Sequence, residues 1–103
     1  MIYIEVPDEN DSMVSIELDD KEYFLRFTYN EKYDYWSMGI YDEDEEPIVN
    51  AVKMVSGFPL FMMYKDQRLP SGSFGVIGEA DKAGRQSFVN GEAELVYIPS
   101  TEV

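Results

Sequence analysis

Apolar and polar residues alternate along most of this chain, and the alternation predicts β-strands. The run "MVSIEL" places Val14, Ile16 and Leu18 on one face, which is the pattern of a strand with one buried side. A short turn, "DDK", separates it from "EYFLRFTY", in which every second residue from Tyr23 is again apolar. We therefore expect these two runs to form an antiparallel hairpin.

Shorter runs of the same kind continue to the end of the chain. "YWSMGIY" follows a loop at 30–34, and "EAELVYI" lies near the C-terminus. Between them, "IVNAVKMV" and "FPLFMMY" are weaker strand candidates, because Pro59 cannot donate to a ladder. A further strand is expected around 74–77, and the polar stretch after it carries at most a short irregular helix at 80–83.

About seven or eight short strands with little helix are typical of an all-β sandwich or a small antiparallel β-barrel. Residues 1–103 are interpreted as a single domain, because this length suits one core. The polar segment "PDENDS" separates the first strand from the body, so residues 1–12 are expected to form a strand or an arm that pairs with a neighbouring subunit. The expected core residues are Leu18, Tyr23, Leu25, Phe27, Trp36, Met38, Ile40, Leu95 and Tyr97.

The segment "GFPLFMMY" is the most apolar stretch of the chain that is not clearly a strand. Methionine adapts well to contact surfaces, and an exposed apolar patch of this size is unusual on a lone monomer. The segment is therefore expected to be either core or an interface with another subunit. Its candidate interface residues are Phe58, Leu60, Phe61, Met62, Met63 and Tyr64.

The composition excludes several classes of function. The 103 residues carry a net charge of −13, from 21 acidic against 8 basic residues. Nucleic-acid binding needs cations that replace the counterions of phosphates, so we expect no direct binding to nucleic acid or to an anionic membrane. The high charge favours solubility or a partner with a basic surface.

Cysteine and histidine are both absent. The chain therefore has no thiolate nucleophile, no sulfur-ligated zinc and no imidazole general base. The glycines form no phosphate-binding motif, and Asp34, which precedes an aromatic pair, is more simply the start of a strand than half of a glycosidase pair. We expect no cofactor and no catalytic site.

Five consecutive acids form the most conspicuous polar feature: Asp42, Glu43, Asp44, Glu45 and Glu46. A calcium loop would need a glycine at its sharp bend and a bidentate glutamate about twelve residues from its start, whereas Pro47 follows this run at once. We expect a hairpin tip, either solvated or docked against a basic neighbour, and no metal.

The start "MIYIEVPDEN" does not have the pattern of a signal peptide, and no apolar run reaches the roughly 20 residues of a membrane helix. We therefore expect a soluble protein that is made and assembled in a cytoplasm.

The order of these pieces resembles a known family. The resembling elements are "SIELDDKEYFLRFTYNEKYDYWSMGIYD", "EPIVNAVKMVSGFPLF", "RLPSGSFGVI" and "GEAELVYIPSTE", which run from about Ser15 to Glu102. In this order and spacing they are similar to the baseplate plug proteins of phage tails. The chain departs from the family at the turn before Pro47, where an Asp-x-x-Gly pattern is expected and every residue is acidic.

The resemblance implies a structural protein of the virion, at the baseplate hub near the distal end of the tail tube. It implies a homo-oligomer around the tail axis, with the hub, the spike and the tail tube or its initiator as neighbours, and no enzymatic turnover. An acidic lining would then let DNA pass without sticking. The alternatives are a free-standing acidic module that binds a basic protein or a small ligand, and a carboxylate-dependent hydrolase.

Overall fold

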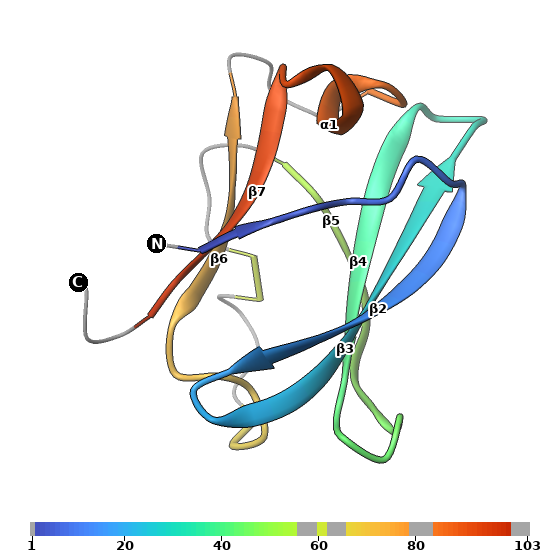
Figure 1. Cartoon of the computed structure of the whole chain (residues 1–103). Helices are drawn as coiled ribbons and strands as arrows, with labels where there is room; N and C mark the ends of the chain where they lie inside the picture. The colour runs from blue at the N-terminus through green and yellow to red at the C-terminus, as the bar shows by residue number, and fades with distance from the viewer. Residues whose placement is uncertain (1, 56–59, 62–65, 79–83, 100–103) are drawn as a thin grey trace.

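The structure is built from two antiparallel β-sheets, which Figure 1 shows as two layers around a shared core. The computed structural model describes residues 2–55, 60–61, 66–78 and 84–99. One sheet has the strand order β1-β7-β6, and the other has the order β2-β3-β4-β5. The elements are β1 (Ile2–Ile4), β2 (Asp11–Leu18), β3 (Lys21–Asn30), β4 (Tyr35–Tyr41), β5 (Pro47–Lys53), β6 (Ser73–Gly78), α1 (Ser87–Asn90) and β7 (Ala93–Ile98).

The sandwich is confirmed, and the alternative of a closed barrel is wrong, because no ladder joins the two sheets within the described ranges. β1 and β2 follow each other in sequence but lie in different sheets. β1 pairs with β7 of its own chain, and the connection 5–10 then crosses to β2. Ile4 and Val6 are buried in the core on this path. Of the expected strand or arm at residues 1–12, Ile2–Ile4 form a strand that pairs within its own chain, and the arm that reaches a neighbouring subunit stays a prediction.

The first hairpin has the geometry that the alternation predicts. Asp19 and Asp20 form its two-residue turn with φ of 53° and 65°, and such turns require positive φ at both positions. Leu18 pairs with Lys21 across this turn. Because the side-chain period of a strand is two, this register sends the apolar residues of β2 and β3 to one face.

A single apolar cluster fills the space between the sheets. Every residue expected in the core from the sequence is buried. The smaller sheet and the connections contribute more than the sequence indicated. These additional buried residues are Ile4, Val6, Val49, Met54, Leu60, Phe61, Phe74, Val76, Ala93 and Val96.

Leu60 and Phe61 belong to this core, with exposures of 6% and 8%. The Leu60 N–H donates to the carbonyl oxygen of Phe74 over 2.8 Å, and the Phe61 and Phe74 rings meet edge to face at 5.6 Å. Of the two alternatives expected for this segment, core or interface, burial in their own chain favours the core for these two residues. The other candidates of this segment, Phe58, Met62, Met63 and Tyr64, lie outside the described residues.

The helix α1 was not expected at its position. The residues expected to be helical, 80–83, lie outside the described part of the chain, and α1 forms a single turn further on. The Gly84 N–H donates to the Ser87 hydroxyl over 2.8 Å before the turn, and Gly91 ends it with φ 84°. Phe88 packs against the core. So short a helix is stabilised by tertiary packing rather than by its own sequence.

Trp36 joins this helical segment to the larger sheet. Its indole N–H donates to the Gly84 carbonyl oxygen over 3.0 Å. Its ring lies 5.4 Å from the Tyr29 ring and 6.1 Å from the Phe88 ring. The Arg85 guanidinium lies over the same indole at 5.5 Å, within the range of a cation–π contact.

We predict that Trp36→Ala lowers the free energy of unfolding by roughly 3–5 kcal/mol, as for other large-to-small core substitutions. The reason is that the indole is 1% exposed and that its hydrogen bond to Gly84 is lost with it. Urea denaturation followed by circular dichroism measures the change.

Tyr33→Ala is the matched control, because that aromatic side chain is 62% exposed. It should change the free energy of unfolding by less than about 1 kcal/mol, as surface substitutions usually do. A loss below about 1 kcal/mol for Trp36→Ala would show that the indole does not support the core.

Candidate assembly surfaces

The arginines of the described segments are neutralised within the chain. Arg26 pairs with Asp11 over 2.8 Å, and Arg68 with Asp66 over 2.9 Å. The hydrogen bond from Arg26 lowers the pKa of Asp11, and the same pair raises the pKa of the guanidinium. Exposed pairs of this kind add about 0–1 kcal/mol each to stability. Their main consequence is that few cations remain to offset the other carboxylates.

Arg85 is the third such arginine and connects distant segments. Its guanidinium donates to Asp8 Oδ1 over 2.8 Å and to Asn10 Oδ1 over 2.7 Å. It also covers the rings of Trp36 and Tyr29. The connection between β1 and β2 is thereby fastened to the larger sheet.

The unneutralised charge gathers at one end of the larger sheet. The turns at 19–20 and 42–46 connect neighbouring antiparallel strands, so both lie at the same end, at the bottom of Figure 1. Glu17 and Glu22 face each other in the ladder there, and like charges directly opposite are destabilising. The described acids of this end are Glu17, Asp19, Asp20, Glu22, Asp42, Glu43, Asp44, Glu45, Glu46 and Asp66, against Lys21 and Arg68.

The run 42–46 forms the hairpin tip that the sequence predicts. The Asp42 carboxylate accepts from the N–H groups of Asp44 and Glu46 over 2.9 and 3.0 Å. The Glu45 N–H donates to the Asp42 carbonyl oxygen over 2.9 Å. Glu45 then has φ 61°, the left-handed conformation that glycine adopts without strain. Glu45 is therefore the position where the expected Asp-x-x-Gly pattern has its glycine.

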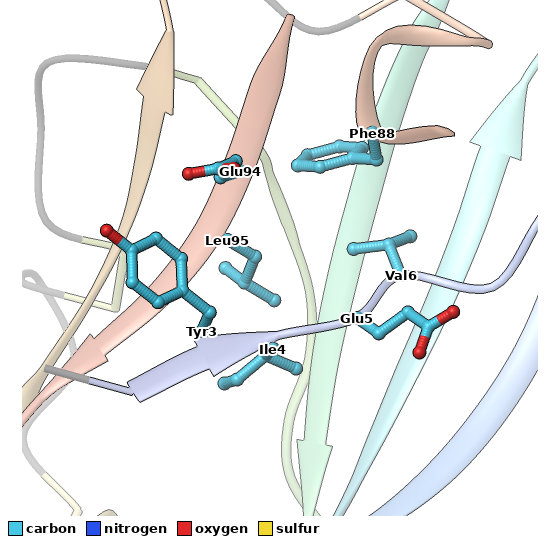
Figure 2. Close-up of a pocket in the computed structure, with 7 residues that line it drawn as sticks. All are labelled: Tyr3, Ile4, Glu5, Val6, Phe88, Glu94 and Leu95. Atoms are coloured by element: carbon cyan, nitrogen blue, oxygen red, sulfur yellow. The ribbon is translucent and has the colours of Figure 1, made fainter. Parts of the chain in front are cut away.

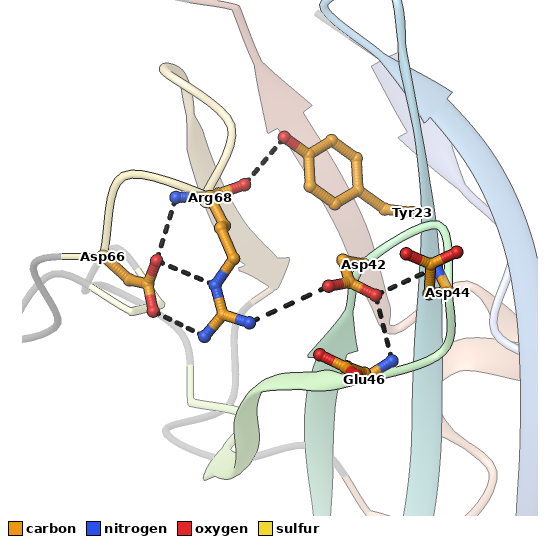
Figure 3. A network of polar contacts seen from close by, with 6 residues as sticks. All are labelled: Tyr23, Asp42, Asp44, Glu46, Asp66 and Arg68. Carbon is orange, nitrogen blue, oxygen red and sulfur yellow. Dashed lines mark hydrogen bonds and ion pairs between the residues drawn. The ribbon is translucent and has the colours of Figure 1, made fainter.

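Arg68 ties this tip to the neighbouring loop, as Figure 3 shows. Its Nη1 lies 3.8 Å from Asp42 Oδ2, and its other nitrogens bind both oxygens of Asp66. Its carbonyl oxygen accepts the Tyr23 hydroxyl over 2.9 Å. Among the five candidate acids, Asp42 therefore has an internal structural role, while the remaining four are exposed.

A second polar network closes the same end of the sandwich. The Tyr97 hydroxyl donates to Asp19 Oδ2 over 2.6 Å and accepts from the Gly72 N–H over 2.8 Å. Asp19 also accepts the N–H and the hydroxyl of Ser71. The hydrogen bond from Tyr97 is the main reason that the pKa of Asp19 is lowered. Burial, with the hydrogen bond to Asp19, raises the pKa of Tyr97 to about 12.

The opposite region of the molecule holds a feature that the sequence did not indicate. A hollow of about 240 Å³ lies beside β1, between β7 and α1, and Figure 2 draws the residues that line it. Its lining residues are Tyr3, Ile4, Glu5, Val6, Phe88, Glu94 and Leu95. They come from the first strand, the helix and the last strand. No local pattern signals such a site, because it exists only once the two ends of the chain lie side by side.

In the described part of the chain, the candidate sites are surfaces, and no metal-binding or catalytic arrangement of side chains is evident. No group of three or more acidic side chains there is arranged to hold a metal ion. Asp34, which the sequence offered as one half of a glycosidase carboxylate pair, accepts a hydrogen bond from the Tyr29 hydroxyl. None of the described helices is long and apolar enough to cross a membrane.

These features define a class of protein: a small acidic β-sandwich whose distinguishing features are surfaces and hairpin turns. The sequence matches the family described as "Cyanophage baseplate Pam3 plug gp18" over residues 1–101. The chain belongs to this family, which makes it a structural component of the baseplate of a phage particle. The resemblance drawn from its strand order is thus confirmed. A search of curated proteins found no match.

We predict that Glu45→Gly raises the free energy of unfolding. A left-handed φ destabilises the folded state by about 1–2 kcal/mol at a residue that has a side chain. Glycine avoids this strain, but its greater freedom in the unfolded chain lowers the free energy of unfolding by about 0.5–1 kcal/mol. The expected net gain is therefore about 0.5–1 kcal/mol, or a rise in melting temperature of roughly 2–8 °C for a domain of this size. A thermal melt followed by circular dichroism measures it.

Glu43→Gly is the matched control, since it removes the same charge from the same turn without a positive φ. It should leave the melting temperature unchanged or lower it. Equal stabilisation by both variants would mean that charge repulsion, and not backbone strain at Glu45, limits the stability of the tip.

We predict that Tyr97→Phe destabilises the fold in a pH-dependent way. At pH 7 it should cost about 1–3 kcal/mol, because Asp19 and the Gly72 N–H lose a partner. Since the pKa of Asp19 is lower in the folded chain, its contribution is complete above the ordinary value of 3.8 and is lost as the pH falls below it. The difference from wild type should therefore narrow between pH 7 and pH 3.

Tyr23→Phe is the control, because it removes a hydroxyl that donates to an uncharged carbonyl oxygen. Its cost should stay constant over the same range. Urea denaturation at low protein concentration, repeated at each pH, gives the loss in free energy of unfolding for both variants. A Tyr97→Phe difference that did not change with pH would show that the bond to Asp19 contributes no charge-dependent stability.

Proposed function

We propose that this protein acts as a plug at the baseplate hub, near the distal end of the tail tube, by assembly and not by catalysis. Membership of the baseplate plug family carries this proposal. The proposed neighbours are the hub, the spike and the tail tube or its initiator. The absence of histidine and cysteine from the sequence agrees with a role that needs no general base or thiolate.

The open sheet edges support assembly through strand contacts. β2 and β5 are the edges of the larger sheet, and β1 is an edge of the smaller one. Edge strands carry unpaired backbone groups that pair readily with another chain. β2 is the longest of these edges, and Met13 on it is 42% exposed. We propose that copies of the chain and its neighbours meet along such edges to form a symmetric assembly around the tail axis.

The acidic end supports the proposed position on the DNA path. Its carboxylates are offset by only Lys21 and Arg68 among the described residues. Such a surface repels phosphates and lets DNA pass without adhesion. It also fits a basic neighbour, since complementary charges mainly speed and orient association.

Quantitative mass spectrometry of purified tailed particles tests the proposal. We expect this polypeptide at a fixed copy number relative to the tail-tube protein, as a symmetric component requires. The matched control is a non-structural phage protein of similar abundance in the lysate, which should be lost during purification. Absence of the polypeptide from particles, despite its abundance in the lysate, would reject the plug role and favour a free-standing module that binds a basic protein.

A further inference from the structure

The hollow beside β1 has the size of a site for one side chain. Its volume of about 240 Å³ lies below the range of roughly 300–1,000 Å³ that is usual for small-molecule pockets. The hollow is partly open to solvent. A group that enters it from a neighbouring protein would not have to move any element of the fold.

Apolar and aromatic groups form the walls of this hollow. Val6 and Leu95 belong to the buried core and line its inner side. Phe88 stands on the helical side, and Tyr3 stands on the side of β1 with an exposure of 59%. Transfer of an aliphatic side-chain stem from water into this hollow is favourable, because it buries apolar surface. The faces of the two aromatic rings attract a cation.

Two carboxylates flank the walls. Glu5 and Glu94 lie on opposite sides of the hollow in Figure 2. The ladder between β1 and β7 ends at Ile4 and Leu95, and the next pair in the same register would be these two glutamates. Like charges at opposed positions disfavour pairing. Within the described part of the chain, neither carboxylate has a hydrogen bond or an ion pair.

We propose that this hollow receives an arginine side chain from a neighbouring baseplate protein. The inference rests on the proposed assembly role and names the kind of group that docks at this surface. The arginine stem lies against the apolar walls, and its planar guanidinium stacks on an aromatic ring. Figure 2 draws both carboxylates pointing away from the hollow, so Glu5 and Glu94 would turn inward to accept charge-assisted hydrogen bonds from the N–H donors of the guanidinium.

A second copy of this chain is a poor source of that arginine. Arg26, Arg68 and Arg85 are each already bound to a carboxylate of their own chain. The partner is therefore a different protein with a basic surface.

An NMR titration of the full chain with N-acetyl-arginine N-methylamide as the probe tests the site. The titration is done in 0.15 M salt, where the Debye length is about 8 Å, so that non-specific attraction between the probe and distant carboxylates is screened. We expect saturable shifts confined to the amides of residues 3–6, 88 and 94–95. The isosteric citrulline amide, which lacks the charge, should bind at least about tenfold more weakly, because charge-assisted hydrogen bonds are roughly twice as strong as neutral ones.

The double variant Glu5→Gln with Glu94→Gln should weaken probe binding at least about tenfold, since both charged partners are lost. The control is Glu43→Gln with Glu45→Gln, which removes the same charge at the acidic end and should leave the affinity within about twofold. Equal weakening by both double variants, shifts spread over all acidic surfaces, or an equally tight lysine amide would overturn the assignment.

Incorporation into particles separates this inference from the proposed function. If the wild-type chain is present in particles and the variant with Glu5→Gln and Glu94→Gln is depleted, both the arginine site and the plug role are supported. Equal incorporation of the two would overturn the arginine site and leave the plug role standing. Absence of the wild-type chain would overturn the plug role, while the titration would still decide whether the hollow binds arginine.

Discussion

The apolar cluster between the two sheets is the constraint on which the arrangement of the sandwich depends, and the buried Trp36 indole belongs to it. The indole rises from the larger sheet and holds the segment before β7 through Gly84 and Phe88. Arg85 covers the indole and holds the connection from β1 through Asp8. These contacts link segments near both ends of the chain to the larger sheet, and the same two ends meet in the ladder between β1 and β7.

Charge has a different role in this molecule from apolar packing. The described arginines are used in exposed ion pairs, which add little stability. The fold is held by its apolar cluster, so the surface can carry an excess of carboxylates without losing its core. In the proposed assembly, that excess of carboxylates would favour basic partners and speed their association. In the proposed assembly role, the exposed carboxylates act through their charge and their placement.

Local patterns predicted the strands β2, β3, β4 and β7, because apolar residues recur at every second position in each of them. They did not predict that β1 joins β7, since that pairing depends on contacts between opposite ends of the chain. The helix α1 was missed because Phe88 docks on Trp36 through tertiary packing. The sequence around Leu60 fits core and interface equally well, and burial with the bridge to Phe74 favours the core. The hollow was missed for the same reason as β1: its walls are far apart in sequence.

The central claim is that this chain folds on its own and is then covered by neighbours at defined surfaces. Amide hydrogen exchange, measured on the free chain and on the same chain in purified baseplates, tests it most directly. We predict slow exchange of β3 and β4 in both states, and new protection in the baseplate at residues 3–6, 92–95 and the acidic turns. Rapid exchange of β3 and β4 in the free chain, or no region that gains protection in the baseplate, would contradict this claim.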